Sequence, residues 1–498
     1  MFTRINTKSS NFLVLLSATL LGLSRVNSYL FFLVFFAFIP LLFYLSKRET
    51  NVFKSAVFFS VIFNVIYIHW ISLVTFWGVI GIIIVFSIYF FFVFFLTQKI
   101  SSYYNYKIIF PFVFLFVWLS LEVFINHTEF RFPWLNIGYA LVDHPLLLQI
   151  ADIGGIFLVS GMILLINIFL FLMIKSFSFS KVIWFLVLIT VWILYGFYSQ
   201  NMFNQKRTNL KIAIAQPNIP ISKKHKPNFL DSTFLIIKKQ VEQAKQKNAN
   251  LVILPESVIP KYILKDRTIY NRIKNISQEN EIELFLGFID FETVDSRILY
   301  FNSAKKISAK ADDPTIYKKN ILVPLGERVP LLDYFPFLWN LKLGQANWEY
   351  GKQTTKHSIK NWEYSPLICF EIAFPHQTIK MTKMGIDFIV NITNDAWFGK
   401  SIGTKQHAKM AILRAIETRK PIFRSANTGY SVVVSPMGEI LKIIDLFTQD
   451  ILVENLILTD KKSLYLTYFN QYVFIFPTVI IILFIIGFIK KWKNNIIQ

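Results

Sequence analysis

The first 200 residues consist mainly of long apolar stretches, each separated from the next by a short polar segment. A membrane-spanning helix needs roughly 20 mostly apolar residues to cross the hydrocarbon core. Seven stretches before residue 200 meet this requirement, and an eighth, NQYVFIFPTVIIILFIIGFI, lies near the C-terminus. The seven spans are expected at about 9–26, 28–46, 54–72, 75–97, 107–125, 145–174 and 181–199. The pattern therefore predicts a helical membrane bundle of about eight spans.

Basic residues occur in every second loop between these expected spans. These loops contain Arg4 and Lys8, then Lys47, Arg48 and Lys54, then Lys99 and Lys107, and then Lys175 and Lys181. The other short loops hold little basic charge beyond Arg25 and Arg131. Short loops rich in lysine and arginine stay on the cytoplasmic side. We therefore expect both termini in the cytoplasm and the segment from about 200 to 468 on the outer side.

Beyond Lys206-Arg207 the pattern changes to short apolar runs that alternate with amphipathic segments. The runs predicted to be buried strands are LKIAIAQ (210–216), LVILPES (251–257), ELFLGFI (283–289), YSPLICF (364–370) and DFIVNIT (387–393). Helical spacing is found over 234–247 and 406–419. Strands that alternate with helices predict an α/β domain. The expected domains are a transmembrane domain over 1–205, an α/β domain over 206–465, and a C-terminal transmembrane helix with a cytoplasmic tail over 466–498.

Composition agrees with membrane embedding and excludes several other classes of protein. Hydrophobic residues make up 54% of the chain and charged residues only 16%, whereas about a quarter of an average soluble domain is charged. The net charge of +22 comes from residues spread along the chain, without a recognisable nucleic-acid-binding motif, so we expect no nucleic-acid partner. A single cysteine excludes an intrachain disulfide and any metal site built from several cysteines.

Two strand-end segments of the α/β domain carry polar groups of catalytic type. In LVILPES a buried strand leads into Glu256, whose partly desolvated carboxylate suits a general base. An acidic residue at a helix N-terminus is an equally good interpretation of that segment alone. In TIYKKNILVPLGERVP (315–330) a lysine at a strand end can stabilise an oxyanion or a thiolate. A Lys-Lys pair is, however, more often a solvated face.

A third strand-end segment, YSPLICFEIAFP (364–375), contains the only cysteine, Cys369. The thiol ends an apolar strand, and a helical pattern follows Pro375. Backbone N–H groups at such a turn are expected to lower the pKa of the thiol. A lone cysteine is more often a small packing residue, so its catalytic role depends on the three segments taken together.

The three segments resemble the glutamate, lysine and cysteine motifs of the nitrilase superfamily. The matching motifs are Pro255-Glu256-Ser257, Tyr317-Lys318-Lys319 and Ile368-Cys369-Phe370-Glu371. The resemblance implies a four-layer αββα sandwich and a Glu256–Lys319–Cys369 triad.

The order of membrane and soluble segments is similar to one branch of that superfamily, the apolipoprotein N-acyltransferases. Further segments that resemble this branch are AQPNIP (215–220), LVPLGERVP (322–330), NITNDAWFG (391–399), QHAKMAILRAIETRKP (406–421) and RSANTGYS (424–431). The resemblance implies a multi-pass enzyme of the bacterial inner membrane with its catalytic domain in the periplasm. The implied reaction is the last step of lipoprotein maturation, a ping-pong acyl transfer through a cysteine thioester.

The partners implied by the resemblance are a phospholipid acyl donor, commonly phosphatidylethanolamine, and a diacylated apolipoprotein acceptor. We expect contact with membrane lipids, no cofactor and no metal ion. A monomer is expected, because an opening toward the lipid leaves little need for a second copy.

The resemblance also assigns roles to single residues. Glu256 would be the general base, and Lys319 would hold the oxyanion together with the backbone N–H that follows Cys369. The acids Glu327 and Glu371 would support this arrangement. Possible substrate contacts are Trp134, His225, Phe370 and Asn394.

Two of these possible contacts depart from the family pattern, and a third is ambiguous. His225 stands where the family often has Trp, and Phe370 where it often has Tyr. Trp134 lies in FRFPWLNIGY, which fits either an aromatic belt at the membrane interface or the lining of a lipid entry route.

Two other functions remain open at this stage. The same thioester chemistry with water as acceptor would make the chain a membrane-tethered amidase or hydrolase. A transporter or scaffold with a degenerate domain is the non-enzymatic alternative, and Glu122 and Asp152 are the candidate intramembrane charges for it.

Overall fold

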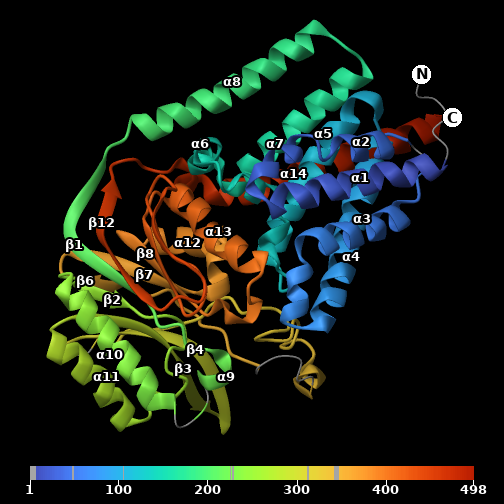
Figure 1. Cartoon of the computed structure of the whole chain (residues 1–498). Helices are drawn as coiled ribbons and strands as arrows, with labels where there is room; N and C mark the ends of the chain where they lie inside the picture. Colours follow the sequence, from blue (N-terminus) through green and yellow to red (C-terminus); the bar gives the residue numbers. More distant parts are fainter. Residues whose placement is uncertain are drawn as a thin grey trace. The chain divides into compact units, whose positions relative to one another are not determined.

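A computed structural model describes residues 7–47, 50–104, 106–224, 226, 229–310, 313–340 and 347–497. The chain divides into two compact units, Met1–Ser199 with Thr467–Gln498, and Gln200–Leu466 (Figure 1). We refer to them as the membrane unit and the sandwich unit.

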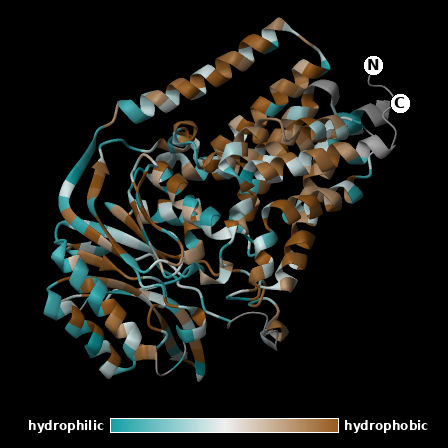
Figure 2. Cartoon of the chain, in the orientation of Figure 1, coloured by the Kyte–Doolittle hydropathy of each residue, from teal (hydrophilic) through white to brown (hydrophobic). Residues whose placement is uncertain are grey.

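The membrane unit is helical, and hydrophobic residues predominate along its helices (Figure 2). Within the described residues, six helices are long and apolar enough to cross a membrane: Ser28–Leu45, Phe76–Ser101, Ile109–His127, Ala151–Lys175, Phe179–Asn201 and Leu464–Lys493. The apolar helices Asn11–Val26 and Val52–Tyr67 are shorter. The predicted helical membrane domain is thus confirmed, with six full-length helices at six of the eight expected spans.

In chain order, the helices of this unit are α1 (Thr7–Val26), η1 (Ser28–Phe35), α2 (Ile39–Leu45), α3 (Val52–Tyr67), η2 (His69–Leu73), α4 (Phe76–Ser101), α5 (Tyr106–His127), η3 (Pro133–Leu135), η4 (Ile137–Leu141), α6 (Pro145–Leu148), α7 (Ala151–Lys175), α8 (Phe179–Asn201) and most of α14 (Leu464–Ile497). Three expected spans are not single α-helices. The span at 28–46 is a 3₁₀-helix followed by α2, the span at 54–72 is α3 followed by the 3₁₀-helix η2, and the span at 145–174 comprises α6 and α7. Within α7, Gly155 has a positive φ of 63°, a backbone conformation that glycine adopts readily. This residue interrupts the helix.

Buried charges of the membrane unit anchor the segment around Trp134. Arg25 donates hydrogen bonds to the carbonyl oxygens of Trp134 and Leu135, at 2.8 and 3.2 Å. Glu122 accepts a hydrogen bond from the backbone N–H of Ile137 at 2.8 Å. Asp152, the other candidate charge, accepts one from the Tyr195 hydroxyl at 2.6 Å. Both acids are therefore engaged in contacts within the unit, which gives the transporter interpretation no support.

The sandwich unit contains two six-stranded mixed sheets. The first has the order β12-β1-β2-β3-β4-β5 and the second β11-β10-β9-β8-β7-β6. The strands of the first sheet are β1 (Gln205–Gln216), β2 (Leu251–Ile253), β3 (Glu283–Val294), β4 (Arg297–Ile307), β5 (Ile316–Lys318) and β12 (Asp450–Thr459). Those of the second are β6 (His357–Ile359), β7 (Trp362–Ile368), β8 (Phe388–Thr393), β9 (Ile422–Ala426), β10 (Ser431–Val434) and β11 (Ile440–Ile444).

Helices cover the outer face of each sheet. Helices α10 (Leu230–Gln246) and α11 (Arg267–Asn280) pack on the first sheet, and α12 (Pro375–Thr382) and α13 (Ile402–Thr418) lie with the second (Figure 1). The inner faces meet each other, since the rings of Phe285 on β3 and Tyr364 on β7 are 5.5 Å apart. The Ser425 hydroxyl on β9 also donates to the carbonyl oxygen of Ala215 on β1 at 2.8 Å. The predicted αββα sandwich is confirmed.

Parallel pairing aligns the strand ends that precede the candidate residues. Strand β2 runs parallel to β1 and β3, and β8 runs parallel to β7 and β9. The carboxyl ends of parallel strands meet at one edge of their sheet, where loops are free to carry functional groups. All five predicted strands and both predicted helices are present, and β5 is the strand expected before Lys319, whereas β4, β6 and β9–β12 were not predicted as elements.

Candidate active site

Each of the three expected catalytic residues closely follows a strand. Glu256 comes three residues after β2, Lys319 directly after β5, and Cys369 directly after β7. The Lys319 ammonium lies 3.9 Å from Oε1 of Glu256, and both side chains are buried. The charges of Glu256 and Lys319 both act on the Cys369 thiol. Three segments spread over more than 100 residues of sequence thus meet in one site.

The carboxylate of Glu256 is held by two donors. Asn302 on β4 donates from its side-chain amide to Oε1 at 2.6 Å, and the backbone N–H of Asn394 donates to Oε2 at 2.9 Å. Gly287 on β3 lies so close that a Cβ atom there would come within 2.8 Å of the Glu256 Cα. This close approach and the two hydrogen bonds fix both the backbone and the carboxylate of Glu256.

The ammonium of Lys319 is paired with Glu327 at 2.7 Å. The other oxygen of Glu327 accepts a hydrogen bond from the backbone N–H of Val323 at 2.9 Å, which orients the carboxylate. Burial by itself would lower the pKa of Lys319, but the charges of Glu327 and Glu256 raise it above its ordinary value. Lys319 therefore carries a fixed positive charge, which is what stabilisation of an oxyanion requires.

Cys369 stands at a sharp change of direction between β7 and the 3₁₀-helix η7 (Cys369–Ala373). Its φ of 52° lies in the left-handed region, which is uncommon for a non-glycine residue and frequent at functional turns. Burial raises the pKa of its thiol, the charge of Glu256 raises it further, and Lys319 opposes both. This outcome differs from the predicted low pKa, because burial and the nearby carboxylate outweigh the cation.

Glu371 lies under the turn that carries Cys369 and is fully buried. Its carboxylate accepts hydrogen bonds from the backbone N–H groups of Ile368 and Asn320, both at 2.7 Å, and from the Tyr317 hydroxyl at 2.8 Å. Burial raises the pKa of Glu371 to about 7, although the backbone donors oppose the shift. The side chain ties the loop after β5, which carries Lys319, to the loop after β7.

Of the four residues expected to contact substrates, the structure describes three, and each lies in different surroundings. Asn394 is at the site, where its backbone N–H contacts Glu256 and its side chain accepts from Asn427 at 3.3 Å. Phe370 is buried against Phe374 in an edge-to-face pair. Trp134 belongs to the membrane unit, where it is 1% exposed beside Phe132, and its substrate contact stays a prediction. His225 lies outside the described residues.

Two residues of the site were not found from the sequence. Asn302 lies on an unpredicted strand, and nothing in the sequence around it signals a contact with Glu256. Lys224 ends the short helix α9 (Ile221–Lys224) and is 7% exposed. Burial lowers the pKa of Lys224 to about 8, against the charge of Glu256. Its position just after the AQPNIP segment is the signal that could have identified it.

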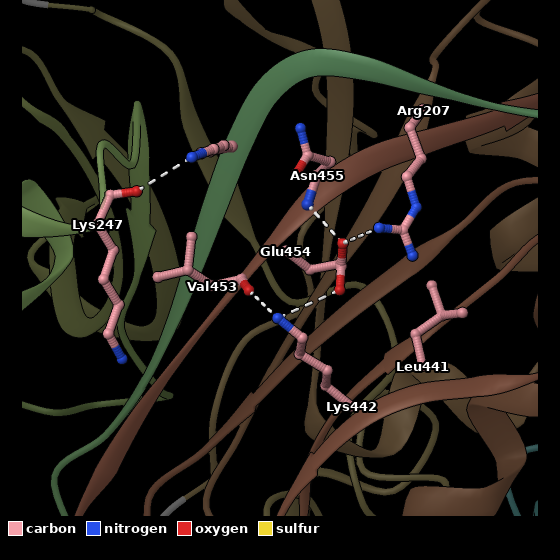
Figure 3. A pocket seen from close by; sticks show the side chains of 8 residues that line it. Arg207, Lys247, Leu441, Lys442, Val453, Glu454 and Asn455 are labelled. Carbon is pink, nitrogen blue, oxygen red and sulfur yellow. Dashed lines mark hydrogen bonds and ion pairs between the residues drawn. The ribbon is translucent and has the colours of Figure 1, made fainter.

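A surface pocket of about 450 Å³ lies elsewhere in the sandwich unit (Figure 3). It is lined by Arg207, Lys211, Lys247, Leu441, Lys442, Val453, Glu454 and Asn455. The Glu454 carboxylate lies 3.8 Å from Arg207 and 3.3 Å from Lys442 and so offsets part of the positive charge. None of the expected site residues that the structure describes lines this pocket, so the Glu256 site is the candidate for the chemistry.

Comparison with known proteins identifies the family. The chain matches the carbon-nitrogen hydrolase family over residues 211–462 and the apolipoprotein N-acyltransferase N-terminal domain over residues 17–169. It is 32% identical over 361 residues to the apolipoprotein N-acyltransferase of Geobacter metallireducens, which covers 71% of this chain and 69% of that protein. It is also 32% identical over 348 residues to the Aquifex aeolicus protein of the same name, which covers 68% of this chain and 75% of that protein.

Two further comparisons extend over different parts of the chain. The apolipoprotein N-acyltransferase of Chlorobaculum tepidum is 27% identical over 495 residues, covering 91% of this chain and 92% of that protein. The solved structure of an amidase from Nesterenkonia sp. AN1, of the nitrilase superfamily, is similar over 50% of this chain and 92% of that chain, with 16% identity and a TM-score of 0.39. From the matched families and relatives, the chain belongs to the apolipoprotein N-acyltransferase family and is a multi-pass membrane enzyme of lipoprotein maturation.

Proposed function

We propose that this enzyme moves an acyl chain from a membrane phospholipid to the free α-amine of an S-diacylglyceryl-cysteine at a lipoprotein N-terminus. The transfer proceeds in two steps through a thioester on Cys369. The observation that carries the proposal is the pairing of a half-buried thiol of raised pKa with a carboxylate and a lysine of fixed charge. A thiol that stays protonated at rest needs a base at the moment of attack, and Glu256 is held in place to be that base.

In the first step Glu256 accepts the thiol proton while Sγ attacks the carbonyl carbon of the phospholipid ester. The tetrahedral oxyanion is stabilised by the Lys319 ammonium and by the backbone N–H of Phe370. The intermediate collapses when the C–O bond of the ester breaks. Glu256 returns its proton to the leaving alkoxide, which departs as a lysophospholipid, and the acyl chain stays on Cys369 as a thioester.

In the second step the α-amine of the acceptor attacks the thioester carbonyl, and Glu256 accepts a proton from the amine. A second oxyanion forms at the same position and is stabilised by the same groups. The C–S bond breaks, an amide forms, and the proton on Glu256 restores the Cys369 thiol. Atoms and charges balance over the cycle without a cofactor or a metal ion.

Glu327 and Glu371 act through other groups. Glu327 fixes the Lys319 ammonium at 2.7 Å, and Glu371 binds the backbone on both sides of the site. Phosphatidylethanolamine is the donor that we propose, and Phe370, Asn394, Trp134 and His225 are the side chains proposed to contact the substrates. We further propose that a monomer in the bacterial inner membrane is the active form.

The proposed orientation has the catalytic domain, residues 206–465, in the periplasm and both termini in the cytoplasm, with membrane domains over 1–205 and 466–498. The distribution of basic loops supports this orientation. It also suits the chemistry, because both substrates are anchored in the bilayer.

The test is a Cys369→Ala variant assayed with phospholipid and a synthetic diacylated lipopeptide. We expect N-acylation to be abolished while membrane insertion is unchanged, because no other thiol is present in the chain. N-acylation by the alanine variant would contradict the mechanism. Release of free fatty acid by the wild type, with no acylated peptide, would instead favour the membrane-tethered hydrolase.

A further inference from the structure

A buried polar cluster that the mechanism above does not use lies directly behind the nucleophile. It consists of Asp395 at the start of η8 (Asp395–Phe398), His407 on α13 and Arg424 on β9, each at most 1% exposed. Asp395 Oδ2 lies 2.7 Å from Arg424 Nη2, and Asp395 Oδ1 lies 2.8 Å from His407 Nδ1. The Thr393 hydroxyl donates a further hydrogen bond to Asp395 Oδ1 at 2.9 Å. These contacts fix the plane and position of the imidazole.

The other ring nitrogen, His407 Nε2, lies 3.2 Å from the carbonyl oxygen of Cys369. A carbonyl oxygen can only accept a hydrogen bond and the Arg424 guanidinium beside Nδ1 can only donate one, so these two contacts fit the tautomer with the proton on Nε2. The opposite nitrogen, Nδ1, faces Asp395 and also lies 3.1 Å from Arg424 Nη2. Rotation of the ring would break all of these contacts, so the Nε2–H group has one direction available to it.

The Cys369 carbonyl belongs to the same peptide unit as the Phe370 N–H. That unit is planar and trans, so its C=O and N–H groups point in opposite directions. A hydrogen bond that fixes the carbonyl therefore also fixes the direction of the N–H, the backbone donor proposed for the oxyanion. Cys369 is in the left-handed region with φ 52°, so an external contact is needed to stabilise this orientation of the peptide.

We propose that His407 is a positioning residue that holds the Cys369–Phe370 peptide in the orientation needed for oxyanion stabilisation, with Asp395 and Arg424 holding the imidazole. The inference rests on the proposed thioester mechanism and adds to it the group that aims the backbone donor.

Two other roles for the cluster fit the contacts less well. Ligand atoms of Cys369, Asp395 and His407 lie within 4.8 Å of one another, a spacing that could suit a metal ion. However, Arg424 already neutralises Asp395, and its guanidinium would repel a second cation there. A direct base role for His407 toward the thiol is disfavoured because both ring nitrogens have other partners, Nε2 at the Cys369 carbonyl oxygen and Nδ1 at Asp395 and Arg424.

The test compares His407→Leu, which removes the donor, with His407→Gln, whose side-chain amide can still donate to the carbonyl. The control is His357→Leu, because His357 is also a buried histidine paired with an aspartate, Asp313 at 3.3 Å, and it lies on β6. The measurement is the rate of acyl-adduct formation on Cys369 by intact mass over a range of phospholipid concentrations, with Tm recorded for every variant.

We expect the maximal acylation rate of His407→Leu to fall by about 10- to 100-fold, somewhat less than the loss of a whole oxyanion donor, with little change in the phospholipid concentration that gives half the maximal rate. His407→Gln should recover most of the rate, and His357→Leu should lower Tm without slowing acylation. If the leucine variant does not fold, His407→Asn, whose amide is too short to reach, replaces it.

Two results would overturn the inference. One is a maximal acylation rate in His407→Leu that equals the wild-type rate. The other is a loss of acylation rate that follows the drop in Tm across the leucine, glutamine and control variants. That result would indicate a purely structural role. A wild type that forms no adduct at all would refute the thioester mechanism itself, so the two failures are distinguishable.

Discussion

The side-chain amide of Asn302 donates a hydrogen bond of 2.6 Å to Oε1 of Glu256. Asn302 lies on β4, whereas Glu256 follows β2, and strand β3 separates the two strands in the sheet. The contact therefore crosses a neighbouring strand, next to Gly287 on β3, which lies against the Glu256 backbone. It fixes the carboxylate in the position from which, in the proposed mechanism, Glu256 accepts the thiol proton.

Replacing Asn302 by leucine should slow acylation of Cys369 by about 10- to 100-fold, because a hydrogen bond to a charged group contributes roughly 1.5–3 kcal/mol. The neighbouring Ser303→Ala variant is the control, since Ser303 is also buried on β4 but its hydroxyl makes no hydrogen bond to any described residue. Single-turnover formation of the acyl adduct is the measurement. A rate within twofold of the wild type for Asn302→Leu would show that Glu256 needs no such support.

The stability of the sandwich unit should depend on the protonation of Glu371. Its pKa is about 7 in the folded chain against an ordinary value of 4.5, so the folded state binds the proton more tightly than the unfolded state. The resulting stabilisation is complete below pH 4.5 and is lost as the pH rises through about 7. Its size is roughly 3 kcal/mol as an order of magnitude.

The measurement is Tm in detergent between pH 4 and pH 8 for the wild type and Glu371→Gln. Glutamine cannot ionise, so the difference in Tm should move in favour of the variant as the pH rises. The subtraction removes the contribution of all other titrating groups. A difference that stays constant from pH 4 to pH 8 would contradict the raised pKa.

Cys369 should react slowly with alkylating reagents at neutral pH, because burial and Glu256 keep it as a thiol. The rate of reaction with iodoacetamide should rise about tenfold per pH unit and continue to rise beyond pH 9. As Cys369 is the only cysteine, the label needs no assignment. The unfolded protein in denaturant is the control for access to the thiol. A rate that reaches a plateau below pH 8 would indicate a preformed thiolate.

The strands and the three motifs could be predicted because they depend on local sequence. Short apolar runs followed by Pro255-Glu256 or by Cys369 mark strand ends, and the sheets bring those ends together. The interrupted spans were missed because hydropathy does not distinguish a 3₁₀-helix from an α-helix. The break at Gly155 depends on backbone conformation rather than on hydropathy.

The pKa of Cys369 and the contacts of Asn302 and His407 could not be predicted, because they depend on pairing between distant segments. His407 lies on a predicted amphipathic helix, where its position reads as an ordinary core site. Only the packing of α13 beside η7 brings its imidazole to the Cys369 carbonyl. Likewise, the sequence indicates a turn at Cys369 but not the burial that sets the pKa of its thiol.

The central claim is the thioester on Cys369, and intact mass of the purified enzyme after incubation with phosphatidylethanolamine tests it most directly. We predict an added mass of one acyl chain, located on Cys369 and removed by neutral hydroxylamine or by the diacylated lipopeptide. The adduct should form much more slowly in Glu256→Gln. An enzyme that N-acylates the lipopeptide, yet shows no adduct on Cys369 after incubation with phospholipid alone, would contradict the account.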